Sequence, residues 1–99
     1  MINDDGAPYV VSINIESEEH SHALTEIVLT LRSHDIPATH EGASSLAAEV
    51  IVERKYMPYL RKECSNYAFS MSVDENADYV AHFHFTEKVE AAKFRMLFG

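Results

Sequence analysis

Two runs of alternating apolar and polar residues, joined by a short polar stretch, constrain the fold of this chain most strongly. Apolar side chains fall at every second position over residues 67–73, and residues 79–85 repeat the pattern. A period of two places the apolar set on one face of a strand. The five residues 74–78 between the runs are polar apart from Ala77, which suits a hairpin loop. The sequence therefore predicts an antiparallel β-hairpin.

The N-terminal third predicts a strand followed by a helix. Residues 1–8 are polar and contain glycine and proline, so we expect a flexible lead. Apolar residues alternate over residues 9–15, which indicates a strand. Ser17, followed by two glutamates, suits a helix N-cap, and apolar residues then recur at helical spacing. Pro37 ends this predicted helix because the residue before a proline disfavours helical angles.

The middle of the chain allows two interpretations. After a short extended piece at residues 38–41 and a turn at Gly42, apolar residues alternate over residues 47–53, which favours a strand. The alternative is one kinked helix over residues 45–64, which would hold Pro58 inside it at a cost of about 3 kcal/mol. We prefer a strand followed by a separate short helix, because proline is well tolerated in the first turn of a helix.

A last helix, from about residue 87 to residue 98, is predicted after a cap at Thr86. Its apolar residues form two faces about 180° apart. One face has Val89, Ala92 and Met96, and the other has Ala91, Phe94 and Phe98. A surface helix needs only one apolar face, so we predict that Phe94 and Phe98 form part of an oligomer or partner interface. The alternative is a terminal helix that its own domain buries on both sides.

These elements predict an α+β fold. Their order is strand, helix, weak strand, strand, short helix, strand, strand, helix. It matches a ferredoxin-like split βαβ antiparallel sheet with an extra C-terminal strand and helix. We expect one domain over residues 9–99, because a chain of 99 residues supplies a single small core. Ferredoxin-like sheets host many unrelated activities, so the fold class indicates no function.

The charged residues are divided unevenly along the chain, whose net charge is −8. Residues 1–53 contain ten acidic residues and one basic residue, a net charge of −9, whereas residues 54–99 contain six acidic and seven basic residues, a net charge of +1. An acidic surface repels phosphate backbones and attracts basic protein surfaces. We therefore expect a protein partner, steered by acidic residues around the first helix. These residues are Glu16, Glu18, Glu19, Glu26 and Asp35.

The sequence lacks the common catalytic motifs. With only three glycines it contains neither a phosphate-binding loop nor a dinucleotide fingerprint. No serine lies in a Gly-x-Ser-x-Gly turn. The single cysteine, Cys64, excludes a disulfide within the chain, and the neighbouring Glu63 disfavours a thiolate there. We expect no enzymatic activity and no cofactor.

Two His-x-His pairs are the remaining candidates for chemistry. On a strand, His82 and His84 project from the same face, which makes them weak candidates for metal ligands, whereas His20 and His22 diverge on a helix. The sequence offers no third ligand nearby, so we favour histidines that line a solvated face of the sheet. A further hypothesis is that their protonation near pH 6 weakens association.

The C-terminal stretch Phe83-x-Phe85-x-Glu87-x-x-x-Ala91-Ala92-x-Phe94-x-x-x-Phe98-Gly99 resembles the ending of small uncharacterised proteins of tailed bacteriophages. In those proteins a strand leads into an Ala-x-x-Phe helix, and the chain stops at an aromatic-glycine pair. The resemblance covers about a sixth of the chain and implies no enzymatic activity. It implies that a compact, acidic protein of this kind acts by occupying a host protein.

Three classes of function follow. We favour a non-enzymatic acidic interaction protein, encoded by a phage, that inhibits or modulates a host nuclease, polymerase or defence complex by docking on its basic surface. Mimicry of DNA by the carboxylates is a narrower version. The second class is a homo-oligomeric structural or small-ligand-binding module, and the third is a histidine-based, metal-dependent enzyme.

Two further expectations concern nucleic acid and location. The basic residues around the predicted short helix offer a nucleic-acid site, but the acidic half of the chain disfavours it. These residues are Arg54, Lys55, Arg61 and Lys62. No apolar run is long enough to span a bilayer, and the first residues lack the basic region of a signal peptide. We therefore expect a cytoplasmic protein.

Overall fold

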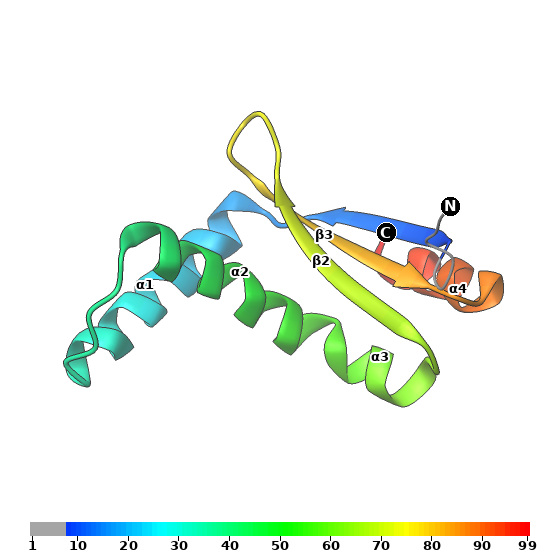
Figure 1. Ribbon diagram of the computed structural model, residues 1–99, viewed down its shortest axis with the longest axis horizontal. Coiled ribbons are helices and arrows are strands. Elements are labelled where there is room, and N and C mark those ends of the chain that lie inside the picture. Colours follow the sequence, from blue (N-terminus) through cyan, green and yellow to red (C-terminus); the bar gives the residue numbers. More distant parts are fainter. Residues whose placement is uncertain (1–7) are drawn as a thin grey trace.

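The structure, a computed structural model, describes residues 8–99, so the predicted flexible lead lies outside it except for Pro8. These residues form four helices and one three-stranded sheet (Figure 1). The elements in chain order are β1 (Tyr9–Asn14), α1 (Ser17–Ser33), α2 (His40–Lys55), α3 (Met57–Glu63), β2 (Tyr67–Val73), β3 (Tyr79–Phe85) and α4 (Lys88–Phe98). No helix in this part of the chain combines the length and the apolar character needed to cross a membrane.

The central strand of the sheet is β3, which pairs antiparallel with β1 on one side and β2 on the other. Thus β1 and β2 run parallel with β3 between them, as in a split βαβ unit. Residues 8–99 contain no fourth strand, so the complete ferredoxin-like βαββαβ arrangement is absent. The predicted α+β class is confirmed, and the predicted ferredoxin-like sheet with an extra strand is wrong. Among the residues described, no strand lies beside the outer edge of β1 or of β2.

The predicted hairpin is confirmed, with β2 and β3 in continuous register from Tyr67 opposite Phe85 to Val73 opposite Tyr79. The loop is closed by the carboxylate of Asp74, whose Oδ1 accepts hydrogen bonds from the backbone N–H groups of Asn76 (2.9 Å) and Asp78 (3.0 Å). Short polar side chains bond to nearby backbone in this way, which is why they favour turns. The hairpin loop projects from the body of the molecule (Figure 1).

The predicted strand over residues 47–53 is wrong, because these residues lie within α2. The buried side chains of this helix lie along one face, with neighbours on that face three or four residues apart. They are Ala43, Ala47, Ala48, Ile51 and Val52. Apolar residues at positions 46, 48, 50 and 52 produce a period of two, but Ala47 and Ile51 between them are also apolar, so the sequence fits both periods.

The start of α2 corrects two further predictions. The side chain of Thr39 caps the helix, since its Oγ1 accepts a hydrogen bond of 2.9 Å from the backbone N–H of Gly42. Residues 40–41 are therefore helical rather than extended, and Gly42 lies in the first turn of α2 rather than in a separate turn. The predicted short helix with Pro58 in its first turn is confirmed as α3.

The other predicted helices differ from the structure by about one residue at their starts. Glu16, rather than Ser17, occupies the N-cap position of α1, and Glu87, rather than Thr86, that of α4. Helix α1 ends at Ser33, and Asp35 then adopts a left-handed φ of 56°. Pro37 is therefore not the residue that terminates this helix.

The core lies on one face of the sheet. Ala81, Phe83 and Phe85 of β3 are fully buried, whereas the alternating residues of this strand are half-exposed. Helix α4 covers β1 and β3, where the ring of Phe94 packs 4.7 Å from that of Phe83 and 5.3 Å from that of Phe85. Tyr56, between α2 and α3, packs edge-on against Phe83. Aromatic pairs of this kind contribute about 0.5–1.5 kcal/mol beyond their buried area.

The helical arm, which we define as α1 and the first half of α2 (residues 17–47), extends away from the sheet (Figure 1). Its two helices lie side by side, and Ala23 is the only buried residue of α1. Ser44 ties the arm to the sheet, because its Oγ accepts a hydrogen bond of 3.2 Å from the Tyr79 hydroxyl. The ring of His20 stacks on that of Tyr79 and its Nε2 lies 2.9 Å from the Ser44 carbonyl oxygen.

Candidate functional site at the free edge of the sheet

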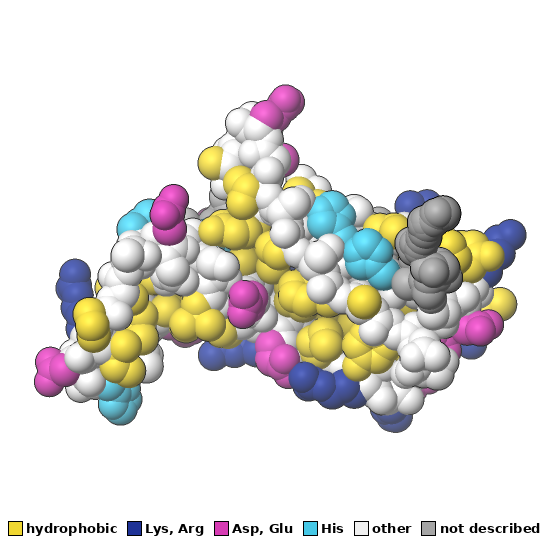
Figure 2. Space-filling view, viewed as in Figure 1, with side chains coloured by type: hydrophobic (Ala, Val, Ile, Leu, Met, Phe, Trp, Pro, Cys, Tyr) yellow, Lys and Arg dark blue, Asp and Glu magenta, His cyan; other side chains and the backbone are white. Residues whose placement is uncertain are grey.

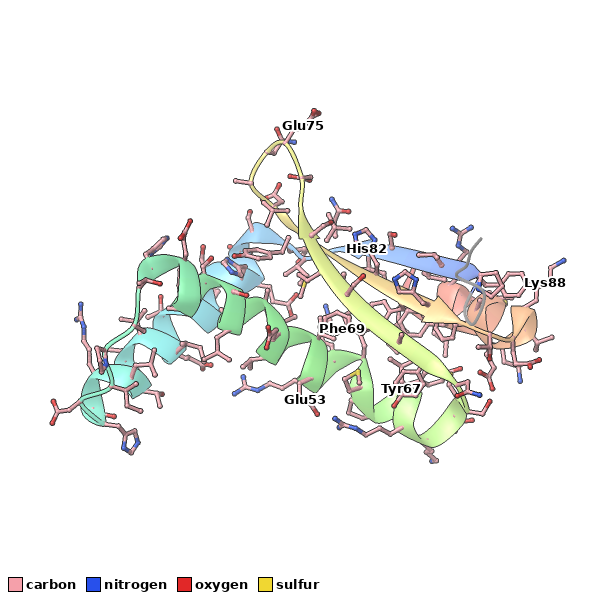
Figure 3. All side chains as sticks on the ribbon, viewed as in Figure 1. Glu53, Tyr67, Phe69, Glu75, His82 and Lys88 are labelled. Atoms are coloured by element: carbon pink, nitrogen blue, oxygen red, sulfur yellow. The ribbon has the colours of Figure 1, made fainter. Side chains whose placement is uncertain are left out.

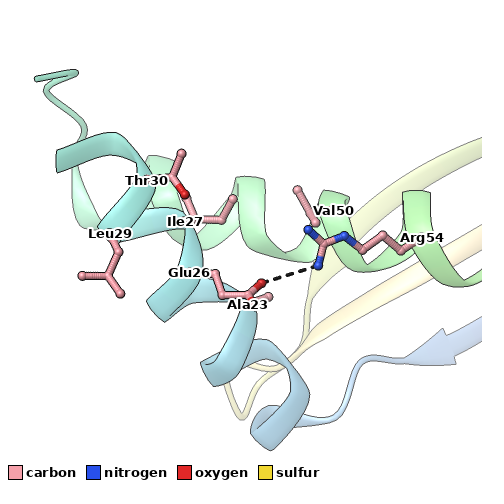
Figure 4. A pocket seen from close by; sticks show the side chains of 7 residues that line it. All are labelled: Ala23, Glu26, Ile27, Leu29, Thr30, Val50 and Arg54. Atoms are coloured by element: carbon pink, nitrogen blue, oxygen red, sulfur yellow. Dashed lines mark hydrogen bonds and ion pairs between the residues drawn. The ribbon is translucent and has the colours of Figure 1, made fainter. Parts of the chain in front are cut away.

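Two of the predicted partner-binding carboxylates are paired with basic residues of α2. Glu19 Oε1 lies 3.2 Å from the Nζ atom of Lys55, and Glu26 Oε1 lies 3.5 Å from Nη1 of Arg54. The second pair spans a shallow groove between α1 and α2 (Figure 4). Lys55 and Arg54 belong to residues 54–99, whereas the two glutamates belong to the acidic residues 1–53. Their pairing neutralises part of the predicted acidic surface.

The other predicted carboxylates lie at opposite ends of α1. Asp35 follows the C-terminal end of this 17-residue helix, and Glu16 precedes its start. At 1.5 Å per residue these ends are about 25 Å apart. Only Glu16 and Glu18 remain close together and without an ion pair among the residues described. The five predicted residues therefore do not form one contiguous surface.

The fold places the acidic hairpin loop beside the start of α1. The backbone N–H of Ile15 donates a hydrogen bond of 2.9 Å to the carbonyl oxygen of Tyr79, so Glu16 lies near the base of the loop. Glu75 marks the projecting tip (Figure 3). The loop carboxylates form no ion pair within residues 8–99. They belong to Asp74, Glu75 and Asp78.

The segment before β2 has little net charge. Arg61 and Lys62 lie in the last turn of α3, and Glu63 follows them. Nη1 of Arg61 lies 2.6 Å from Oε2 of Glu53, and this hydrogen bond lowers the pKa of the Glu53 carboxyl and raises the pKa of the Arg61 guanidinium. The loop after β2, by contrast, is acidic.

The structure corrects the prediction that Phe94 forms an interface. This side chain is fully buried, and Phe98 is half-buried beside Tyr56 and Tyr59. The opposite face of α4 is exposed: Val89 retains 64% and Met96 retains 86% of its accessible surface. The helix has two apolar faces, as predicted, but the one left uncovered by residues 8–99 does not contain Phe94. The alternative, burial of both faces, is also wrong for this part of the chain.

The two histidines of β3 lie on the outer face of the sheet, opposite the core. His82 is hydrogen-bonded to serines of both edge strands: its Nδ1 lies 2.7 Å from Ser12 Oγ and its Nε2 lies 2.7 Å from Ser72 Oγ (Figure 3). Nε2 of His84 lies 3.1 Å from Ser70 Oγ. Residues 8–99 contain no group of three or more side chains that could hold a metal ion. Both ring nitrogens of His82 already have hydrogen-bond partners.

Cys64 is half-buried at the C-cap of α3. Burial raises the pKa of its thiol, and the nearby carboxylates of Glu90 and Glu63 raise it further. A raised pKa disfavours the thiolate, which is the nucleophilic form of cysteine. This environment therefore does not suit a catalytic nucleophile.

The free edge of β2 is an unprotected edge strand. Its seven residues, Tyr-Ala-Phe-Ser-Met-Ser-Val, contain no charge and no proline, and their pairing with β3 has no bulge. Natural edge strands are usually protected by charged residues, proline or bulges. Within the part of the chain that the structure describes, no hydrogen bond reaches the backbone of β2 from its outer side.

The side chains of β2 that face the helices are incompletely covered. Tyr67, Phe69 and Met71 are half-buried, and Val73 retains 54% of its accessible surface. Tyr67 and Phe69 point toward α2 and α3 (Figure 3). Figure 2 shows hydrophobic side chains gathered along this side of β2, with acidic side chains on the projecting hairpin. An extended segment added to β2 would complete the cover of this apolar strip.

The outer edge of β1 differs from that of β2. Helix α4 packs against β1, and the groove between them is lined partly by Lys88 and Arg95. Positively charged side chains beside an edge strand disfavour the pairing of further strands. The edge of β2 is therefore the more accessible of the two.

Comparisons with known proteins give no match to a family model, to a curated protein or to a solved structure. The site at β2 was not predicted, because alternation within residues 67–73 predicts a strand but not its position in the sheet. The signal available in the sequence was the absence of charge over these seven residues. That signal becomes informative only when the strand is known to lie at an edge.

Proposed function

We propose that this protein acts by binding another protein, which contributes an extended segment that pairs with the free edge of β2. The observation that supports the proposal is a seven-residue edge strand without charge, proline or bulge, flanked by half-exposed apolar side chains. In strand addition, main-chain hydrogen bonds supply affinity, and the side chains at alternate positions supply specificity. No catalytic step is required for this role.

The chemistry around β2 defines the partner segment. Apolar side chains at alternate positions would pack beside Phe69 and Met71, and small polar side chains would lie beside Ser70. Basic residues at one end would pass the acidic loop at residues 74–78. The partner is still expected to be basic, but the carboxylates that attract it lie on the hairpin loop rather than around α1. Attraction of this kind mainly raises the association rate and weakens with salt.

The resemblance to phage proteins is compatible with this mode of binding. A phage-encoded protein that occupies a host nuclease, polymerase or defence complex would need only a recognition surface. Mimicry of DNA has less support, because Glu19 and Glu26 are paired with Lys55 and Arg54. That the protein inhibits or modulates a host protein stays a prediction, and binding at the edge of β2 is the way in which we propose that it would do so.

Two matched substitutions test the proposal. Ser70 on β2 and Ser12 on β1 are exposed, lie opposite His82 in the register, and each bonds to one histidine of β3. Ser70→Lys places a charge on the free edge of β2, whereas Ser12→Lys makes the same change on the other edge strand. Circular dichroism and thermal unfolding would establish that both variants fold.

Affinity capture from native host cells, with wild type and both variants as bait, gives the decisive measurement. We expect a protein that wild type and Ser12→Lys retain and Ser70→Lys loses, with retention falling from low to near-physiological salt. A second copy of this chain counts as such a protein. If all three baits retain the same proteins, the edge of β2 is not the binding site and the proposal is wrong.

A further inference from the structure

We infer that the segment added to β2 is the β2 strand of a second copy of this chain. Two molecules would then form one continuous six-stranded antiparallel sheet, with a two-fold axis through Ser70. This inference rests on the proposed function, because it assigns a partner to the same edge. Three features support it: the symmetry of the strand sequence, the position of the acidic loop at one end of the strand, and the contrast with the other edge.

The sequence of β2 is self-complementary about Ser70. In an antiparallel pair centred on this residue, Phe69 lies opposite Met71 of the second copy, and Tyr67 lies opposite Val73. All four side chains lie on the helix-covered face, since side chains alternate between faces with a period of two. The half-exposed apolar strips of the two molecules would therefore form one layer.

The register centred on Ser70 is favoured over its neighbours. It pairs all seven residues of β2, from Tyr67 opposite Val73 to Val73 opposite Tyr67. A relative slip of one residue would place the apolar set of one copy opposite the serine set of the other, on mismatched faces. A slip of two residues would leave an apolar residue at one end of each strand without a partner.

The position of the acidic loop favours antiparallel pairing. The loop at residues 74–78 follows β2 and contains Asp74, Glu75 and Asp78. Antiparallel strands would keep the loops of the two copies at opposite ends of the pair, whereas parallel strands would bring them side by side. Like charges brought together in this way disfavour association.

The other free edge lacks this complementarity. Lys88 and Arg95 line the groove beside β1, so pairing of two β1 strands would bring basic side chains from both copies to the interface. Like charges across an interface disfavour association. The structure therefore favours β2 as the edge shared between copies.

Charges introduced at the two-fold axis test the inference. In this dimer, residue 70 of one copy lies opposite residue 70 of the other. Ser70→Lys therefore places two lysines opposite each other, and Ser70→Glu places two glutamates opposite each other. Like charges directly opposite each other on paired strands are destabilising. We expect each variant to dimerise up to about fivefold more weakly than wild type, and an equimolar mixture of the two to recover a dimer. Ser12→Lys should dimerise like wild type. Sedimentation equilibrium over a wide range of concentration measures all five samples.

Each outcome decides between the alternatives. Recovery in the mixture supports the inference and also shows that both variants are folded. A mixture that stays as monomeric as its components overturns it, as does a dimer that none of the Ser70 variants weakens, which would point to another surface. A wild type that is monomeric at every concentration also overturns it. The proposed function would still stand if capture of a different protein depended on Ser70 and not on Ser12.

Discussion

The sheet end of the molecule and the helical arm are stabilised by different kinds of contact. At the sheet end, five large side chains from four different elements are fully buried. They are Val52, Leu60, Phe83, Phe85 and Phe94. In the arm, the buried residues of α1 and of the first half of α2 are alanines, whereas Leu29 retains 59% of its accessible surface.

Because the buried side chains differ in size, the free energy gained from burial also differs between the sheet end and the arm. Burial of apolar surface contributes about 25 cal/mol per Å², so alanine contacts contribute much less than contacts of phenylalanine or leucine. Small residues let α1 and α2 approach closely, but they remove little apolar surface from water. The arm should therefore open at a lower free energy than the sheet end, as a locally unfolding unit.

The largest loss of stability is expected from Phe94→Ala. Removal of this fully buried ring should destabilise the protein by about 3–5 kcal/mol, because a cavity would remain between α4 and the sheet. Met96→Ala, on the exposed face of the same helix, should change the stability by less than about 0.5 kcal/mol. Urea unfolding measures both. Equal losses would mean that α4 does not form the core of the sheet end.

A smaller and more local effect is expected from Tyr79→Phe. The substitution removes the hydrogen bond from the Tyr79 hydroxyl to Ser44 Oγ but keeps the ring that stacks on His20. The loss should be about 1 kcal/mol. Amide hydrogen exchange should become faster in residues 17–47 and remain unchanged in β3. Faster exchange throughout the chain would show that the arm and the sheet unfold as one unit.

The smallest effect is expected from Glu53→Gln, at the junction of α2 and α3. The hydrogen bond with Arg61 lowers the pKa of the Glu53 carboxyl in the folded protein. Its stabilisation is therefore present above the ordinary carboxyl pKa and is lost as the pH falls through the lowered value. Both side chains are more than half exposed, so the contribution is small and screened by salt.

A series of urea unfolding curves from neutral to acidic pH tests the sign of this last effect. Wild type should be slightly more stable than Glu53→Gln at neutral pH, and the difference should disappear in acid. High salt should reduce the difference at neutral pH. A difference that grew as the pH fell would contradict the assignment of this ion pair.

The hairpin could be predicted from the sequence because each of its strands faces a single core on one side. In β3, Phe83 and Phe85 are fully buried, and the histidines between them are half-exposed, so burial follows the period of the sequence. In α2 the sequence fits two periods, because Ala47 and Ile51 fill the positions that a strand would leave polar. Only packing against α1 and the sheet selects the helix.

The candidate site depends on contacts between distant segments. The charge count along the chain could not anticipate that Arg54 and Lys55 return beside α1 and pair with its glutamates. It also could not anticipate that the acidic hairpin lies next to the start of α1. The edge position of β2 depends on strand order, which the alternation within one strand does not encode.

The arrangement around His82 couples the hydroxyl groups of two strands that do not touch. A neutral imidazole has one N–H donor and one acceptor nitrogen, so one neighbouring serine accepts a hydrogen bond and the other donates one. Ser12 and Ser72 belong to different edge strands. The tautomer of one ring in the middle of the sheet thus sets the orientation of a hydroxyl group on each of its borders.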